Sequence, residues 1–286
     1  MTSTPLLAIA SAILFGIGSV LSRRGLQHAN PLAAAVVSIT VTTAFVWCLT
    51  LVSGSVSRLF TWKIWPFLVG GLVAPGLARL MSFVGIDRIG VARSTSLMAA
   101  APLFAVVIAM ACLGERPTPV LLLGAAAIVG GGVLLALRSR HETHWRRRDM
   151  IFPALGALGF AFRDNLSRWG LRDYTDSLAA AAAATLTSLV LMWICAAVWR
   201  ARLNVPAASV GFFAVSGVCE GAAYLLMWRA FSIGSVSVVS PVVNSYSIVA
   251  IALAAIFLRD LERVTWRIVV AAVLIVAGVA LVVRGA

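Results

Sequence analysis

Charged residues are scarce in this sequence. They occupy 12% of the 286 positions, whereas 61% of the positions are hydrophobic; soluble proteins carry roughly 25% charged residues. A water-soluble globule of this composition is therefore excluded. Lysine is almost absent, since Lys63 is accompanied by 22 arginines. Because the arginines are spread along the whole chain and do not gather in one patch, the net charge of +13 is not expected to bind nucleic acid.

Residues that form disulfides or hold metals are few. The four cysteines lie within apolar runs and are expected to be small buried residues, whereas the three histidines lie between the runs. Sequence motifs of serine hydrolases, zinc metalloproteases and P-loop nucleotide-binding proteins are also missing, so we expect no enzyme, no metal and no cofactor. The residues concerned are Cys48, Cys112, Cys195 and Cys219, and His28, His141 and His144.

Long apolar runs are what the sequence does contain. A helix needs about 20 residues to cross ~30 Å of hydrocarbon, and ten runs are long enough. Three of them carry ionisable residues inside the run. The runs are continuous and rich in Ala, Leu and Val, which excludes a membrane β-barrel of short alternating segments. The predicted spans are 4–22, 32–53, 64–84, 91–112, 117–137, 150–170, 178–199, 207–228, 236–257 and 264–284.

The two halves of the chain resemble each other. A shift of 145 places residues 21–26 on 166–171 with five identities in six, and a shift of 147 places Glu115 on Glu262. Each half holds five spans, an odd number, so the second half must enter the membrane from the opposite side. We therefore predict an all-α integral membrane protein of ten transmembrane helices in two inverted five-helix repeats. Their bounds are 1–137 and 150–286, joined by a polar loop at 138–149.

Short motifs recur at matching places in the two halves. Residues 22–26 read SRRGL and 167–171 read SRWGL; residues 113–118 read LGERPT before a Gly-rich run, with an echo at 261–265. Together these motifs resemble the EamA-type branch of the drug/metabolite transporter superfamily. The resemblance implies a ten-helix carrier, often an exporter of amino acids or other small metabolites, with a central cavity lined by both repeats. The second half departs from the pattern by three extra residues, 258–260, before its junction.

Two charged residues stand deep inside predicted spans. A charge at the bilayer centre costs at least ~2.5–3.5 kcal/mol, so Glu220 is expected to have a functional or structural role that offsets this cost. It shares a helical face with Tyr224 and would bind a substrate amine or a coupling proton. The alternative is a structural ion pair with Arg79. Arg79 follows Pro75 closely, and its guanidinium suits a carboxylate or phosphate unless it snorkels to the headgroups.

The sixth span carries a third candidate, Asp164. It lies four residues before Arg168 and could form a bridge along its own helix. Arg163 and Asp164 are adjacent, point about 100° apart, and are not expected to face one another. In the other interpretation, Asp164 and Asn165 face a cavity and Asp164 carries a coupling proton or binds a substrate amine.

The ninth span carries a polar stripe of Ser240, Asn244 and Ser247, with Tyr246 beside it. An asparagine amide has four hydrogen-bonding sites to satisfy at membrane depth, so this stripe is expected to line a cavity and orient substrate. Its counterpart in the fourth span includes Ser96. The small residues of the fifth and tenth spans are expected to pack helices together or to form a dimer interface. These are Gly130, Gly131, Gly132, Ala271, Ala277 and Gly278.

The sequence predicts a multi-pass carrier of the inner or plasma membrane that moves a small polar metabolite by alternating access. Without an ATP-binding module, it must use an ion or substrate gradient. Its expected partners are a small-molecule substrate, membrane lipid and, in a homodimer, a second copy of the chain. Alternatives are a flippase for a phosphate-bearing lipid and a non-transporting scaffold or sensor.

The distribution of basic residues predicts the orientation in the membrane. Fourteen basic residues lie on the loops that share a side with 138–149 and seven lie on the other side, which places both termini outside. The resemblance implies the reverse orientation.

Overall fold

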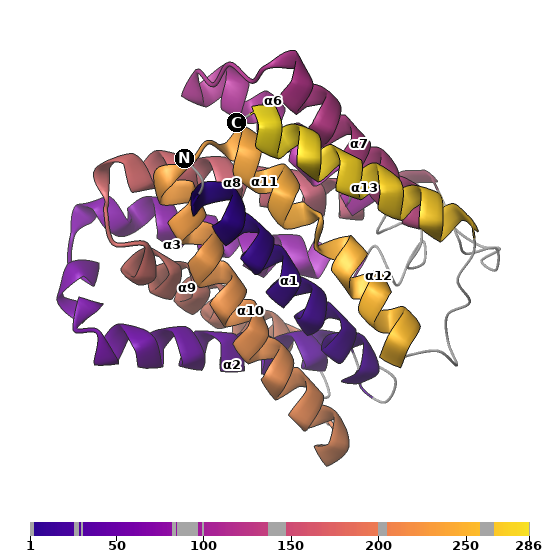
Figure 1. Cartoon of the computed structure of the whole chain (residues 1–286). Coiled ribbons are helices and arrows are strands. Elements are labelled where there is room, and N and C mark those ends of the chain that lie inside the picture. Colours follow the sequence, from indigo (N-terminus) through magenta and orange to yellow (C-terminus); the bar gives the residue numbers. More distant parts are fainter. Residues whose placement is uncertain are drawn as a thin grey trace.

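The chain folds as a bundle of helices, and the part described contains no strand (Figure 1). The computed structural model describes residues 3–25, 29, 31–81, 84, 97–98, 100–136, 147–199, 205–257 and 266–285. Its α-helices are α1 (Ser3–Gly25), α2 (Pro31–Val52), α3 (Trp65–Gly71), α6 (Ala101–Leu113), α7 (Pro119–Ala136), α8 (Ile151–Asp173), α9 (Ser177–Val198), α10 (Ala207–Ile233), α11 (Val236–Asn244), α12 (Tyr246–Phe257) and α13 (Trp266–Gly285). Shorter helical turns are η2 (Ser55–Leu59), η3 (Trp62–Ile64), η4 (Leu72–Leu77) and η5 (Arg147–Met150).

Five of the described helical segments are long and apolar enough to cross a membrane. They coincide with five of the predicted spans. Four further apolar helices are shorter, and α8 has 23 residues but carries several charges. The all-helical membrane class is thus confirmed, while the count of ten spans stays a prediction. The five segments are Ser3–Ser22, Leu32–Val52, Trp62–Met81, Ser177–Val198 and Ser209–Ile233.

The first helices of the two halves run in opposite directions. Thr4, in the first turn of α1, lies against Gly234 at the end of α10. Arg168, near the end of α8, donates hydrogen bonds to the carbonyls of Phe231 and Ser232 in the last turn of the same α10. Helix α1 therefore begins at the end of the bundle where its sequence counterpart α8 finishes, as inverted repeats require.

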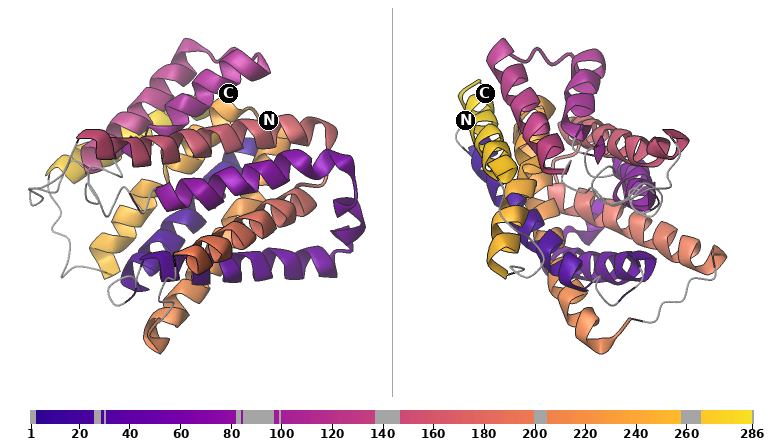
Figure 2. Two further views of the ribbon diagram at one scale, coloured as in Figure 1. Left: turned by 180° about the vertical axis from the view of Figure 1, so that it is seen from behind. Right: turned by 90° about the vertical axis from the view of Figure 1, so that its right-hand side faces the viewer.

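Helices of the two halves interleave instead of forming two separate units (Figure 2). Helix α1 packs along α10, α2 along α9, α6 along α8, and α7 along α13. The last pair approaches most closely at Gly124 and Gly278, where a Cβ on either residue would lie within 3 Å of the other's carbonyl oxygen. The predicted packing role of Gly278 is confirmed here within one chain, because only glycine lets two helix backbones come this near.

Two of the membrane segments are broken near their middle. In the third, Ala74 has extended backbone angles (φ −151°, ψ 133°) immediately before Pro75, so α3 and the wide turn η4 do not continue as one regular helix. In the ninth, the chain is interrupted at Ser245 between α11 and α12, four residues after Pro241. Proline lacks an N–H and clashes with the preceding turn. The first break places extended backbone five residues before Arg79, whereas Ser245, at the second break, keeps helical backbone angles directly after Asn244.

The prediction that all four cysteines are buried is wrong. Cys48 in α2 and Cys112 in α6 are exposed on the outside of the bundle, and Cys195 and Cys219 are half-buried. In a soluble protein an apolar run predicts burial, but in a membrane helix the outward face of the run meets lipid, which accepts a thiol equally well.

Candidate functional site

A salt bridge joins the two halves of the chain in the middle of the bundle. Arg79 Nη2, from the end of the broken third segment, lies 2.7 Å from Glu220 Oε2 at the midpoint of α10. The two side chains are only 17% and 10% exposed. The ion-pair alternative for Glu220 is therefore what this conformation contains, and a substrate would have to displace one partner from the other.

Two serine hydroxyls complete the surroundings of Glu220. Ser38 in α2 donates to Oε2 at 3.2 Å, and Ser216, one turn before Glu220, donates to Oε1 at 3.5 Å. Ser216 also bonds the carbonyl of Gly18 at 2.8 Å. A Cβ at Gly18 would come within 3.3 Å of Glu220 Cγ, so the missing side chain leaves room for the carboxylate between α1, α2 and α10. Ser38 was not predicted from the sequence, because it is one of several hydroxyl residues in its apolar run and has no charged residue near it there.

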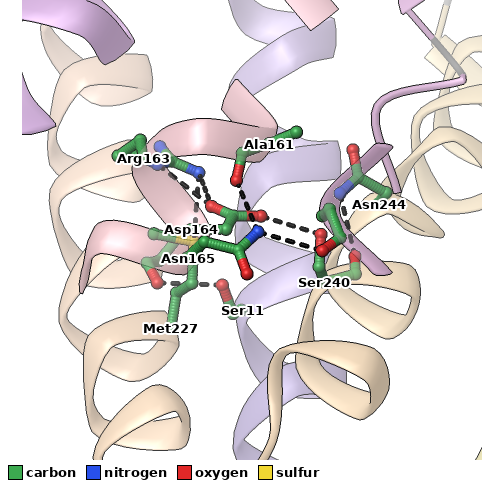
Figure 3. A network of polar contacts seen from close by, with 10 residues as sticks. Ser11, Ala161, Arg163, Asp164, Asn165, Met227, Ser240 and Asn244 are labelled. Atoms are coloured by element: carbon green, nitrogen blue, oxygen red, sulfur yellow. Dashed lines mark hydrogen bonds and ion pairs between the residues drawn. The ribbon is translucent and has the colours of Figure 1, made fainter. Parts of the chain in front are cut away.

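A second ion pair lies within α8 (Figure 3). Arg163 contacts Asp164 Oδ1 through Nη2 at 2.6 Å and through Nε at 3.1 Å, while Ser240 of α11 donates to Oδ2 at 2.7 Å. The predicted bridge between Asp164 and Arg168 is wrong, since Arg168 bonds the last carbonyls of α10. The expectation that Arg163 and Asp164 cannot meet is wrong too. The two Cβ atoms do point in different directions, but the arginine side chain is long enough to reach the neighbouring carboxylate.

Tyr224 lies between the two ion pairs. The guanidinium carbon of Arg163 is 5.7 Å from its ring centroid, and Phe15 of α1 meets the ring edge-on at 5.1 Å. The ring is also close enough to interact electrostatically with Arg79 and Glu220. The side chain is 3% exposed. The structure thus brings the predicted residues Arg79, Glu220 and Tyr224 together, and adds Arg163 to them.

The polar stripe of the ninth segment divides into different contacts. Ser240 joins the Asp164 pair, whereas the Asn244 amide donates to the Ser240 carbonyl at 2.8 Å, one turn back on its own helix (Figure 3). Tyr246, at the start of α12, is 36% exposed and its ring lies 6.3 Å from that of Phe15. Two members of the prediction, Ser96 and the side chain of Ser247, lie outside the described residues.

Some buried polar atoms near these residues have no partner within the described part of the chain. The amide nitrogen of Asn165 donates to the carbonyls of Ala105 and Ala161, both at 2.9 Å, but its Oδ1 accepts nothing. The indole nitrogen of Trp228, one turn after Tyr224, is also unpaired. Such groups retain hydrogen-bonding capacity that a water or a polar ligand can use.

Two hollows formed by the described residues lie away from the ion pairs. One, of about 370 Å³, lies on the outer face of α13, lined by Val273 and Val276 among others. The second, of about the same volume, lies between the ends of α2 and α9, beside Leu49 and Ser177. Neither touches Glu220. The charged side chains contact one another in pairs, Arg79 with Glu220 and Arg163 with Asp164.

The fold and the site define a class: a helical membrane protein with two inverted halves and buried charges where the halves meet. A sequence model of the EamA-like transporter family matches residues 2–137 and again residues 149–284. The chain belongs to the EamA-like transporter family, which confirms the resemblance drawn from its motifs. It is accordingly a membrane transporter built from two copies of one family unit.

The fold also occurs in solved structures, 26 chains of which match. One, described as "Crystal structure of protein", aligns with a TM-score of 0.84 and 19% sequence identity, covering 98% of this chain and 96% of that one. At this identity the likeness shows the fold alone. No curated protein matches the chain in sequence.

Proposed function

We propose that this protein is a secondary-active transporter that carries a small polar metabolite, an amino-acid-like compound or an organic anion, across the inner or plasma membrane. Transport proceeds by alternating access, in the export direction. The observation that carries the proposal is the buried salt bridge between Arg79 of the first repeat and Glu220 of the second. The family membership supports transport in general, and this bridge supports a site between the repeats.

The salt bridge makes movement of the two repeats depend on binding of a substrate or a coupling ion. Separating Arg79 from Glu220 leaves two buried charges without partners, which is strongly unfavourable. A carboxylate on Arg79, together with an amine or a proton on Glu220, restores both charges to neutral pairs. The substrate or coupling ion therefore lowers the free-energy cost of the conformational change. Without either, the transporter stays in the conformation in which Arg79 and Glu220 are paired.

The remaining predicted residues have supporting roles in this proposal. Asp164, held by Ser240 and Arg163, is a second protonation site. Tyr224 lies against Arg163 and within electrostatic reach of Arg79 and Glu220. Asn244, Tyr246 and, from the opposite repeat, Ser96 orient the substrate by hydrogen bonds. A homodimer and contacts with membrane lipid are further proposed associations.

The lipid-flippase alternative needs arginines that are free to meet a lipid phosphate at a lateral opening. Arg163 is 5% exposed and bound to Asp164, and Arg168 donates to two backbone carbonyls. Arg163 and Nη1 of Arg168 are thus occupied by the protein itself, whereas the buried Nε of Arg168 has no partner among the described residues. This favours a soluble substrate over a lipid, and the family membership favours a transporter over a scaffold or sensor.

Glu220→Gln tests the proposal in reconstituted liposomes with an imposed proton or substrate gradient. The glutamine keeps the size of the side chain but holds neither the charge nor a coupling proton, so gradient-coupled transport is expected to disappear while the amount of protein in the membrane stays unchanged. Asp173→Asn is the matched control, because it neutralises an acid at the exposed end of α8. Wild-type transport by Glu220→Gln would return Glu220 to a purely structural role.

A further inference from the structure

Helices α1 and α10 run antiparallel along one another, and their contacts lead stepwise from one end of the bundle to Glu220 (Figure 1). At the end of α1, Gly25 lies against Phe213 near the start of α10. One turn further in, the hydroxyl oxygens of Ser22 and Ser216 are 2.7 Å apart. Glu220 follows Ser216 by one turn and lies about 20 Å from the start of α10. Two hydroxyl groups therefore lie between the bundle end and the buried carboxylate.

This end of the two helices lies at the membrane boundary. Ser22 is half-buried and lies about 5 Å before the end of α1, whereas Ser216 is fully buried. The exposed Arg24 lies at the same end, with its guanidinium carbon 6.0 Å from the ring centroid of Phe212. Arginines at the ends of apolar helices are typical of the membrane–water interface. Ser22 thus lies near the water and Ser216 lies inside the bundle.

The two oxygens of Glu220 have different neighbours. Oε2 contacts Arg79 at 2.7 Å and accepts a hydrogen bond from Ser38 at 3.2 Å. Oε1 faces the Ser216 hydroxyl, which is 3.5 Å away. A proton that arrives from Ser216 can therefore bind to Oε1 without passing the guanidinium group that pairs with Oε2.

We propose that Ser22 and Ser216 form the path by which the coupling proton reaches Glu220, from the end of the bundle where α1 finishes. The inference rests on the proposed function, since it takes Glu220 as the coupling-proton site and adds the residues that deliver the proton. A hydroxyl group suits this role because its oxygen can accept one proton while its O–H donates another.

Each transfer along the path forms one O–H bond and breaks another. A hydronium ion at the end of α1 gives a proton to the Ser22 oxygen and leaves as water. Ser22 passes its own proton to Ser216 over 2.7 Å, and Ser216 passes its proton to Glu220 Oε1. For the last step the Ser216 hydroxyl turns toward the carboxylate from the carbonyl of Gly18, which is 2.8 Å away. The net reaction converts hydronium and carboxylate into water and carboxylic acid, which leaves Arg79 to pair with a substrate carboxylate.

Another serine distinguishes a proton path from a purely structural role. Ser11, about three turns before Ser22 on the same face of α1, is buried and donates to the carbonyl of Ala223 in α10 at 2.8 Å. Ser216 makes the same kind of bond in the reverse direction, to a carbonyl of α1, at the same distance. Both hydroxyls hold α1 to α10, but of the two it is Ser216 that contacts Glu220. Ser11→Ala is therefore the matched control for Ser216→Ala.

Infrared spectroscopy of the full-length protein in lipid nanodiscs tests the inference without a substrate. A carbonyl band of a protonated carboxyl group that is present in the wild type and missing in Glu220→Gln belongs to Glu220. After a caged proton is released by light, the growth of this band gives the rate of protonation. Ser22→Ala and Ser216→Ala are each expected to slow this rate by about a hundredfold, the lower end of what a positioned proton donor contributes. Ser22→Thr, which keeps a hydroxyl, should recover the wild-type rate, and Ser11→Ala should not change it.

The midpoint pH of the band is a second readout. The hydroxyl of Ser22 bonds Ser216 and not the carboxylate, so Ser22→Ala should slow protonation and leave the midpoint unchanged. A merely structural role would change stability or the midpoint, but not the rate alone. The charged and titratable groups that interact with Glu220, and that influence this midpoint in every variant, are Arg79, Tyr224, Tyr246 and Cys219.

Wild-type rates in both path variants, or an equal slowing by Ser11→Ala, would overturn the inference. If Ser216→Ala does not fold, Ser22→Ala decides alone, because its position at the half-buried end of α1 tolerates the change. Identical spectra of Glu220→Gln and the wild type would also overturn it, since Glu220 would then take up no proton. Loss of transport in Glu220→Gln would in that case still support a transporter that binds a substrate amine, so the two failures are separate results.

Discussion

At the scale of single residues, the buried charges stabilise the protein only as pairs. Arg79 and Glu220 satisfy each other across the repeats, and Arg163 and Asp164 do so within α8. Removing one member of such a pair leaves an uncompensated charge, which costs more than the pair contributes. The polar residues that surround each pair are hydroxyls, which can donate to a carboxylate without adding charge.

Arg79→Ala is expected to destabilise the protein by about 3–5 kcal/mol, because Glu220 is left buried without its partner. Adding Glu220→Ala to this variant removes the orphaned charge and should restore much of the loss. Chemical unfolding in detergent micelles measures both. If the double variant is as unstable as the sum of the two single variants, the charges do not form a coupled pair.

Tyr174, in the turn between α8 and α9, supplies a pH-dependent contribution outside the membrane segments. Burial, with Asp176 nearby, raises the pKa of its phenol to about 12. The neutral hydroxyl donates to the Arg58 carbonyl at 2.9 Å, a bond that the phenolate cannot make. The unfolded phenol loses its proton near pH 10, so its contribution to stability is present below pH 10 and is lost between pH 10 and 12.

Tyr174→Phe should therefore unfold with a shallower loss of stability between pH 10 and 12 than the wild type, and should be less stable than the wild type below pH 10. Thermal unfolding in detergent at several pH values gives the comparison. Parallel curves for the two proteins over this range would show that the phenol does not titrate with folding.

At the scale of elements, glycines and breaks decide how the helices meet. The pair Gly124 and Gly278 lets α7 and α13 touch through their backbones. The breaks at Ala74 and at Ser245 interrupt the segments that carry Arg79 and Asn244. The first break coincides with Pro75, a residue type that interrupts helices. The second was not predicted, because Pro241 lies a full turn before the interruption and Ser245 has no special backbone preference.

Gly278→Leu should disrupt the crossing of α7 and α13, because even its Cβ would lie 2.6 Å from the Gly124 carbonyl oxygen. We expect a lower yield of folded protein and a loss of stability of about 2 kcal/mol or more, as overpacking gives. Gly130→Ala is the control, since a Cβ there meets nothing within 4 Å. Size-exclusion profiles and thermal unfolding distinguish the two; equal behaviour would contradict the close contact.

At the scale of the whole molecule, the inverted and interleaved halves mean that orientation in the membrane decides which end of the bundle faces which compartment. The excess of arginines on the side of the 138–149 loop predicts that this loop is cytoplasmic. Ser139→Cys in a background without other cysteines should then resist an impermeant thiol reagent in intact cells and react after permeabilisation. Labelling in intact cells would reverse the orientation.

The sequence determined the membrane class, the repeat, its inversion and the family. Hydrophobic length, parity of spans and recurrence of motifs are properties of the chain read in one dimension, so they need no knowledge of neighbours. It also identified Arg79, Glu220 and Asp164 as charged residues within apolar runs, which are expected to have a binding or structural role. Those inferences depend only on the cost of placing a charge in hydrocarbon.

Only the tertiary structure decided the partners. Long arginine side chains reach several acids or carbonyls, so spacing along one helix wrongly paired Asp164 with Arg168. Glu115 was noticed as a motif residue, but its carboxylate accepts a hydrogen bond from the backbone N–H of Val236, at the start of α11 and more than a hundred residues later. These bonds depend on which helices are neighbours in the bundle. That arrangement results from backbone contacts such as the one between Gly124 and Gly278, and the local pattern of charges along the sequence does not predict it.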